Sequence, residues 1–380
     1  MFETTPGRAA AGLMSGALLF LVAAPASAAD PIAIADDLVA LMTSGTRTAA
    51  YESAVETEPG IVTITNFSIT DEPNGAFGEV ATIVVTNPVE SDEGGFSADS
   101  VLLIGGSLTD EVNVIEWEEA ELTAVAVPAA LDEIAVEDAP LPAAGLTVRG
   151  VAFVPPQANP LLIESVTLTL GEAVDGVPYA VAVSLGGIEV PTGVLDNSEP
   201  VAILRSMGFD TLYLDVSVGG SFDSEDDVLT LDDVAIGIRD FGRIELAGIL
   251  TGVPLSRLAE PGGVEILLGT AKVVELQARF ENAGAVEGFL AEQARQTDMA
   301  AEDVAFGLST AFRIFLRTFN SPQLEDQVGD AVGAFLLDPR SISLVARPME
   351  PVPLLEAVGL MMSDPTLLPT LLGVTVSAND

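Results

Sequence analysis

Between Ile61 and about Phe280 the chain consists of short segments in which apolar and polar residues alternate, separated by Gly, Pro, Asn and Asp. Examples are IVTITNFSI (61–69), EVATIVVT (79–86) and GLTVRGVAFV (145–154). Their Val, Ile, Thr and Leu side chains suit a pleated, half-buried surface. Because turn residues return at short intervals and helical periodicity is scarce, the pattern predicts an antiparallel meander rather than a parallel α/β sheet.

After Phe280 the pattern changes to helical spacing. In the segment 297–319, Val304, Leu308, Phe312, Phe315 and Phe319 follow the helical period, and Thr297 or Asp298 is expected to cap its start. The predicted helices are 31–45, 282–296, 297–319, 322–337, 353–362 and 366–373, with returning strands at 341–346 and 374–378. The sequence therefore predicts an α+β fold, with a large, curved antiparallel sheet and C-terminal helices packed against it.

The expected organisation has four parts. They are a signal peptide (1–28), an N-terminal helical segment (29–60), the antiparallel β-sheet region (61–280) and a mainly helical C-terminal region (281–380).

The first 28 residues resemble an export signal. Arg8 precedes an uncharged stretch that ends in Ala26-Ser27-Ala28, and these small residues predict cleavage after Ala28. Pro25 interrupts the apolar run and favours cleavage. The alternative is an uncleaved segment that anchors the protein in the inner membrane. With cleavage, the expected location in a Gram-negative cell is the periplasm.

Acidic residues dominate the charge, with 57 Asp and Glu against 14 Lys and Arg and a formal net charge of −43. This balance argues against nucleic acid as a partner and against attraction to anionic lipid surfaces. The hydrophobic fraction of 49% argues against disorder and is ample for a packed core.

The chain contains no histidine and no cysteine. Ser-His-Asp and Cys-His catalysis, zinc sites built from His or Cys, and disulfides are therefore excluded. Glycine-rich nucleotide-binding motifs do not occur either, and Lys272 stands in a predicted strand without the spacing of a serine–lysine site. We expect no enzyme, no cofactor and no catalytic or metal-binding residue. A hydrolase that uses only carboxylates is an alternative.

The most acidic strand pair is DDVLTLDDVAIGIRDFG (226–242). A calcium loop starting at Asp223 would need glycine at its sixth position, where Val228 stands. Asp232 and Asp233 are adjacent, so they point to opposite faces of a strand unless a bulge lies there. We predict a solvated hairpin rather than an ion site.

Two other features have both a structural and a functional interpretation. Trp117 lies among acids in VIEWEEAEL (114–122), and we expect it to pack on a sheet face rather than to stack on a carbohydrate. Arg313 and Arg317 share one face of a predicted helix. We expect them to pair with nearby acids, although they could instead hold a phosphate or a lipid headgroup.

The strand-and-turn texture of 210–253, with VLTLDDVAIGIRDFGRIELAG at its centre, resembles the AsmA-like group of Gram-negative envelope proteins. Residues 278–304 are similar to the strand-then-helix section of the uncharacterised periplasmic branch of that group, and the resemblance extends over roughly 210–380. It implies a curved β-sheet whose concave side holds acyl chains, and it carries no catalytic residues.

Two functional hypotheses follow. In the first, an apolar sheet face or groove, covered by the C-terminal helices, holds lipid or another hydrophobic ligand. In the second, the protein is a structural or interaction protein of the envelope, with other envelope proteins as partners, a filled core and no small ligand. An internal cavity or an open groove would favour the first.

Overall fold

The computed structural model describes most of the chain after residue 28. The described residues are 29–43, 45–71, 75–92, 94–110, 113–128, 143–155, 159–171, 173–174, 177–195, 198–253, 262–317 and 322–380. The predicted cleavage residues Ala26 and Ala28 lie outside them.

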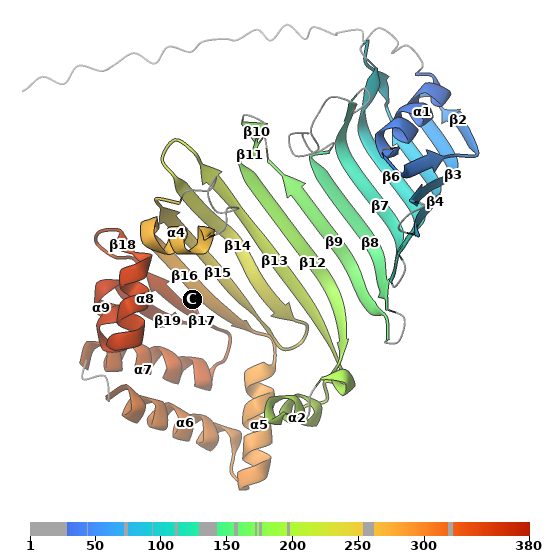
Figure 1. Ribbon diagram of the computed structural model, residues 1–380. Helices are drawn as coiled ribbons and strands as arrows, with labels where there is room; N and C mark the ends of the chain where they lie inside the picture. Colours follow the sequence, from blue (N-terminus) through green and yellow to red (C-terminus); the bar gives the residue numbers. More distant parts are fainter. Residues whose placement is uncertain are drawn as a thin grey trace, which may run out of the picture.

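One large antiparallel sheet dominates the molecule, as the alternating segments predict (Figure 1). Nearly every strand pairs with its neighbours in the sequence, which makes the sheet a meander. The sheet is open. One edge is formed by β1 and β2, which both pair with β3, and the other edge is formed by β19, which pairs with β17. The strands are β1 (Arg47–Ala50), β2 (Ser53–Glu58), β3 (Ile61–Asp71), β4 (Ala76–Thr86), β5 (Val89–Glu90), β6 (Gly95–Thr109), β7 (Val114–Pro128), β8 (Gly145–Val154), β9 (Leu161–Leu170), β12 (Ala180–Pro191), β13 (Thr211–Asp223), β14 (Val228–Ile238), β15 (Gly242–Thr251), β16 (Lys272–Asn282), β17 (Ser341–Ala346), β18 (Val352–Pro353) and β19 (Val374–Ala378). A separate pair joins β10 (Ala173–Val174) to β11 (Val177–Pro178).

The helices gather mostly at the C-terminal end of the sheet, and α1 lies at the opposite end (Figure 1). The helices are α1 (Pro31–Met42), α2 (Glu199–Ser206), α4 (Gly263–Thr270), α5 (Ala285–Thr297), α6 (Ala301–Leu316), α7 (Pro322–Leu337), α8 (Leu354–Ser363) and α9 (Leu368–Leu371). The predicted α+β fold, with an antiparallel meander and C-terminal helices, is confirmed.

Three local expectations differ from the structure. The segment 29–60, expected to be helical, contains α1 but also β1 and β2, which lie end to end along β3. The sheet region also includes two short helices, α2 and α4. Thr297 and Asp298 end α5 instead of capping the next helix, because Asp298 has the left-handed conformation that closes a helix.

One face of the sheet is apolar from end to end; we call it the apolar face. Directly paired residues of an antiparallel sheet point to the same side, so the strand register identifies rows that cross the sheet. One row consists of Val62, Val85, Val101, Leu122, Leu146, Leu168, Val183, Val218, Val234, Leu246, Ala278, Leu344 and Val376. The opposite face is polar in the middle of the sheet, where Thr147, Thr167, Ser184 and Ser217 form a parallel row.

A second row is a line of irregular positions, the kink row, that interrupts the ladder in seven successive long strands. It consists of Asn66, Ala81, Gly105, Glu118, Gly150, Glu164 and Gly187. In alternate strands these residues have positive φ, 51° at Asn66 and 62° to 63° at the glycines. Where a strand crosses the kink row, the nearest buried residues on the two sides of the row lie three positions apart in the sequence instead of the usual two, as Ile64 and Phe67 do in β3. Each strand thus contains one extra residue at the kink row. This residue keeps the same face of the sheet apolar on both sides of the row, and it bends the sheet.

The best-buried core lies between α1 and the N-terminal strands. Ile34 and Ala35 of α1 are fully buried, and the helix packs on β1, β2, β3, β6 and β7. At the other end α7 packs on β17 and β19, and Phe335 meets Phe280 of β16 edge to face at 6.0 Å between ring centroids. Between these ends the apolar face is exposed, and Ile236 is 55% accessible.

Candidate functional site

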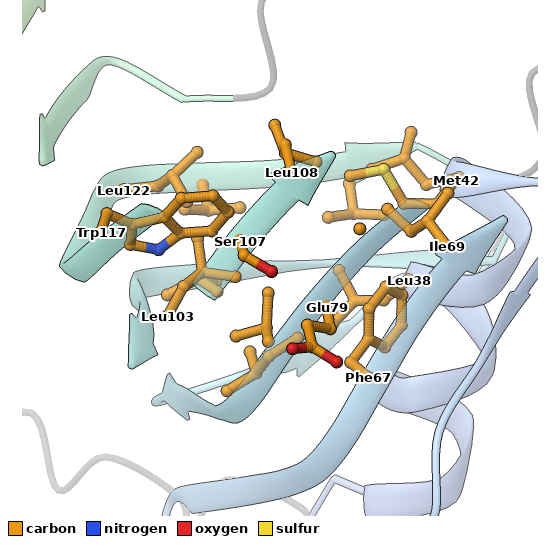
Figure 2. Close-up of a pocket in the computed structure, with 17 residues that line it drawn as sticks. Leu38, Met42, Phe67, Ile69, Glu79, Leu103, Ser107, Leu108, Trp117 and Leu122 are labelled. Carbon is orange, nitrogen blue, oxygen red and sulfur yellow. The ribbon is translucent and has the colours of Figure 1, made fainter. Parts of the chain in front are cut away.

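An apolar cavity of about 220 Å³ lies between α1 and strands β3, β4, β6 and β7 (Figure 2). We call it the α1 cavity. Among its lining residues only Glu79, Ser107 and the indole of Trp117 carry polar atoms in their side chains. The lining residues are Leu38, Leu41, Met42, Phe67, Ile69, Gly78, Glu79, Val80, Ile83, Val101, Leu103, Ser107, Leu108, Trp117, Leu122, Val125 and Val127.

The floor of the cavity is part of the apolar face. Val101 and Leu122 belong to the row that crosses the whole sheet, and Val80 lies beyond the kink row. The kink row therefore brings apolar residues from both of its sides into one concave wall. The apolar face continues past β7 without a helix over it.

The roof is α1, and its sequence explains where it begins. Pro31 occupies the first turn, where its missing N–H costs nothing, and the Asp30 carboxylate accepts a hydrogen bond from the Ile32 amide at 2.9 Å. Ile34 and Leu38 are buried one turn apart on the face toward the sheet. Leu38 and Met42 then extend into the cavity lining.

Polar contacts hold the outer side of α1. The Tyr51 hydroxyl donates a hydrogen bond to Asp36 Oδ1 at 3.0 Å and links the helix to the sheet beyond β1. Burial raises the pKa of Asp37 above its usual value, and the charge of Glu90 adds to the rise, while a hydrogen bond from the Gly95 backbone opposes it. Burial also raises the pKa of Tyr51, together with its bond to Asp36.

Trp117 packs on the apolar face of the sheet, as its sequence context predicts. A Cβ atom at Gly106, its direct partner on β6, would lie only 2.0 Å from Trp117 Cζ2, so the ring occupies the space that a side chain would fill. Its Nε1 atom is buried and has no hydrogen-bond partner among the described residues. Trp117 is the only tryptophan of the chain, which makes it a specific reporter of the cavity.

The acidic pair in β14 lies in a bulge. The ladder with β15 is interrupted between Leu231 and Val234, which leaves Asp232 and Asp233 exposed. Asp233 Oδ1 accepts hydrogen bonds from Ser217 Oγ at 2.9 Å and from Arg243 at 3.3 Å. In the described ranges no three Asp or Glu side chains converge on a point that could hold a metal ion. The segment forms the predicted hairpin.

Arg313 of α6 and Arg317, which directly follows that helix, pair with acids of α7, as we predicted. Arg313 forms an ion pair with Asp330, and Arg317 Nε donates to Glu325 Oε1 at 2.8 Å. These contacts fasten α6 to α7.

Sequence reasoning did not locate the cavity. It expected the C-terminal helices to cover an apolar groove, whereas the roof of this cavity is α1, at the other end of the sheet. The sequence feature that indicates this roof is the four-residue spacing of Ile34, Leu38 and Met42, which places all three on one side of the first helix. Over the part of the chain that the structure describes, no helix is long and apolar enough to span a membrane.

Comparison with known proteins gives little functional information. A family model described as an uncharacterized protein matches residues 235–379, which is less than half of the chain. The matched part runs from β14 to β19 and includes none of the residues that line the α1 cavity. No curated protein matches the chain.

Proposed function

We propose that this is an exported, non-enzymatic protein of the cell envelope that holds a lipid or another apolar ligand. The α1 cavity carries this proposal, because its lining is almost wholly apolar and its floor continues into an exposed apolar face. The proposed location, the periplasm, rests on the sequence of residues 1–28 alone.

The size of the cavity indicates the size of the ligand. An apolar cavity of about 150 Å³ already holds a benzene molecule, whereas pockets for drug-sized ligands measure about 300–1,000 Å³. A cavity of about 220 Å³ therefore suits one alkyl chain or a single ring, and a longer chain would continue over the exposed face.

The exposed part of the apolar face supports the same conclusion. Val218, Ile236 and Ile244 are each more than half accessible, although they point to the same side as the buried core at the α1 end. Contiguous exposed apolar surface of this kind marks a site for a ligand, a membrane or a protein. The alternative function is thus an envelope protein that covers this face with a protein partner and binds no small ligand.

The fluorescence of Trp117 tests the proposal. Titration of the full mature protein with 1-decanol is expected to give a saturable change in Trp117 emission, because the alkyl chain would replace its surroundings in the cavity. Val101→Phe, which fills the cavity from its floor, is expected to weaken binding by about tenfold, equivalent to about 1.4 kcal/mol.

Val55→Phe is the matched control. Val55 is 49% accessible on β2 and does not line the cavity, so the same change of side chain there should leave binding intact. A wild-type protein whose emission does not respond, or equal binding by Val101→Phe and wild type, would contradict the proposal and favour a protein partner.

A further inference from the structure

The predicted cleavage site lies directly before a fixed point of the fold. Ala29, which would be the first residue of the mature chain, packs against the core formed by α1 and the N-terminal strands. The backbone of the next residue is held in place, because the Asp30 amide donates a hydrogen bond to Glu90 Oε1 on β5 at 2.6 Å. Cleavage would therefore create a chain end at a defined place beside Glu90.

Cleavage also changes the charge at this place. Hydrolysis of the peptide bond between Ala28 and Ala29 by a signal peptidase consumes one water molecule, and it leaves a carboxylate on Ala28 and an α-ammonium group on Ala29. Three covalent bonds with a summed length of about 4.3 Å separate the backbone nitrogens of Ala29 and Asp30. The ammonium nitrogen of the mature chain thus lies no more than about 7 Å from Glu90 Oε1.

The charged groups around this point are acidic. Burial raises the pKa of Asp37, and the negative charges of Glu90 and Asp36 add to the rise. Burial likewise raises the pKa of Tyr51, to which its hydrogen bond with Asp36 and the charges of Asp36 and Asp30 contribute. Over the described part of the chain, no arginine or lysine forms an ion pair with Glu90, Asp36 or Asp37. One positive charge at this point would reduce the repulsion among these carboxylates.

We propose that Glu90, supported by Asp36 and Asp37, binds the N-terminal ammonium group of the mature chain, so that cleavage fastens α1 over its cavity. This inference rests on the proposed function, since the ammonium group exists at Ala29 only after export and cleavage. The positive end of the α1 dipole opposes a cation at Ala29. The Asp30 carboxylate, which caps that end, offsets this effect and leaves the attraction of Glu90.

The pKa of the α-amino group tests the inference directly. Reductive methylation with ¹³C-formaldehyde labels two amines of the mature protein, the α-amino group and Lys272, because the chain contains no other lysine. Their NMR signals are followed against pH at low salt, with Lys272 as the internal reference. We expect the α-amino pKa to be about 0.5–1 higher in the folded protein than in urea. The rise is modest because Glu90 is exposed to solvent.

Two variants with the same net charge show where the rise comes from. Glu90→Gln removes the carboxylate next to the chain end and should abolish most of the rise. Glu302→Gln is the matched control, since it removes an exposed carboxylate from α6, at the opposite end of the sheet from α1 (Figure 1). This control should keep the raised α-amino pKa.

The stability of the protein reports whether the ion pair fastens the fold. A group whose pKa rises on folding stabilises the folded state below its unfolded-state pKa, and this contribution is lost as the pH rises through the folded-state pKa. At about pH 6.5 a chain that begins at Ala29 should therefore have a Tm about 1 °C higher than a chain that begins at Ser27. The difference should vanish at about pH 10.5, where the amine is neutral. It should also vanish when both chains carry Glu90→Gln.

The outcomes separate the two proposals. N-terminal sequencing of protein expressed with residues 1–28 shows where the mature chain begins. An uncleaved chain, or one that begins at a residue other than Ala29, would contradict the proposed export by cleavage and overturn this inference with it. If the chain begins at Ala29 but its α-amino pKa does not rise on folding, or the rise survives Glu90→Gln, only this inference is wrong. Equal Tm values for the two chains at about pH 6.5 would also overturn it.

Discussion

At the scale of single residues, the kink row depends on glycine. Gly187 has φ of +63°, and a Cβ atom there would lie 2.7 Å from Glu164 Cβ. That atom cannot swing away as the end of a flexible side chain could. The Gly187 amide also donates to Asp215 Oδ1 at 2.8 Å, at the point where the ladder between β12 and β13 shifts its register.

Gly187→Ala should therefore destabilise the protein. The left-handed backbone alone costs a non-glycine residue about 1–2 kcal/mol, and the contact with Glu164 adds to it. Urea denaturation followed by circular dichroism measures the loss, which we expect to be about 2 kcal/mol or more in the free energy of unfolding.

The control is Gly307→Ala in α6, where nothing lies within 4 Å of the added Cβ and the backbone is helical. Alanine is favoured over glycine in a helix by about 1 kcal/mol, so this variant should be as stable as the wild type or more so. If both substitutions had the same effect, the kink row would not require glycine at position 187.

At the scale of elements, local periodicity predicted most strands and helices. The segments 145–154, 341–346 and 322–337 coincide with β8, β17 and α7, because each presents one apolar side along its whole length. The two edge strands β1 and β2 were missed. Both are largely exposed, so their sequences lack the alternation that marks a half-buried strand.

The candidate site could be predicted only in part. The alternating strands predicted an apolar face, and the context of Trp117 predicted packing on a sheet. The position of the roof depends on which residues α1 meets in space, and helical spacing alone does not encode that. The kink row was also missed, because Asn66 and Gly105 in a strand resemble turn residues until the register of their neighbours is known.

The stability of the α1 roof should depend on one buried side chain. Ile34 is fully buried between α1 and the core of the N-terminal strands. Ile34→Ala should cost about 2–5 kcal/mol in the free energy of unfolding, since it removes buried methyl groups and leaves a cavity. Chemical denaturation monitored by Trp117 fluorescence measures this loss.

Ile32→Ala provides the comparison on the same helix. Ile32 is 57% exposed, so its truncation should change stability by no more than about 0.5 kcal/mol. Equal losses for Ile32→Ala and Ile34→Ala would mean that α1 is not packed as described, and the cavity beneath it would lose its roof.

At the scale of the whole molecule, helices cover the apolar face unevenly, and the net charge is strongly negative. Helices cover the two ends of the sheet, while the middle of its apolar face is exposed. The excess of acidic residues applies to the chain as a whole, with 57 against 14 basic residues. A net charge this far from zero keeps such a protein soluble despite its exposed apolar surface, but it destabilises the compact state through self-repulsion.

Salt should therefore stabilise the fold. The screening length falls from about 30 Å at 0.01 M to about 3 Å at 1 M salt, which removes most of the repulsion among exposed carboxylates. We expect the Tm in calorimetry to rise by several degrees between about 0.01 M and 0.3 M NaCl and then to level off. Screening is nearly complete at that point, whereas a general effect of salt on apolar burial would continue to grow with concentration. A Tm that does not change, or that rises linearly up to 1 M, would show that self-repulsion does not limit the stability of this protein.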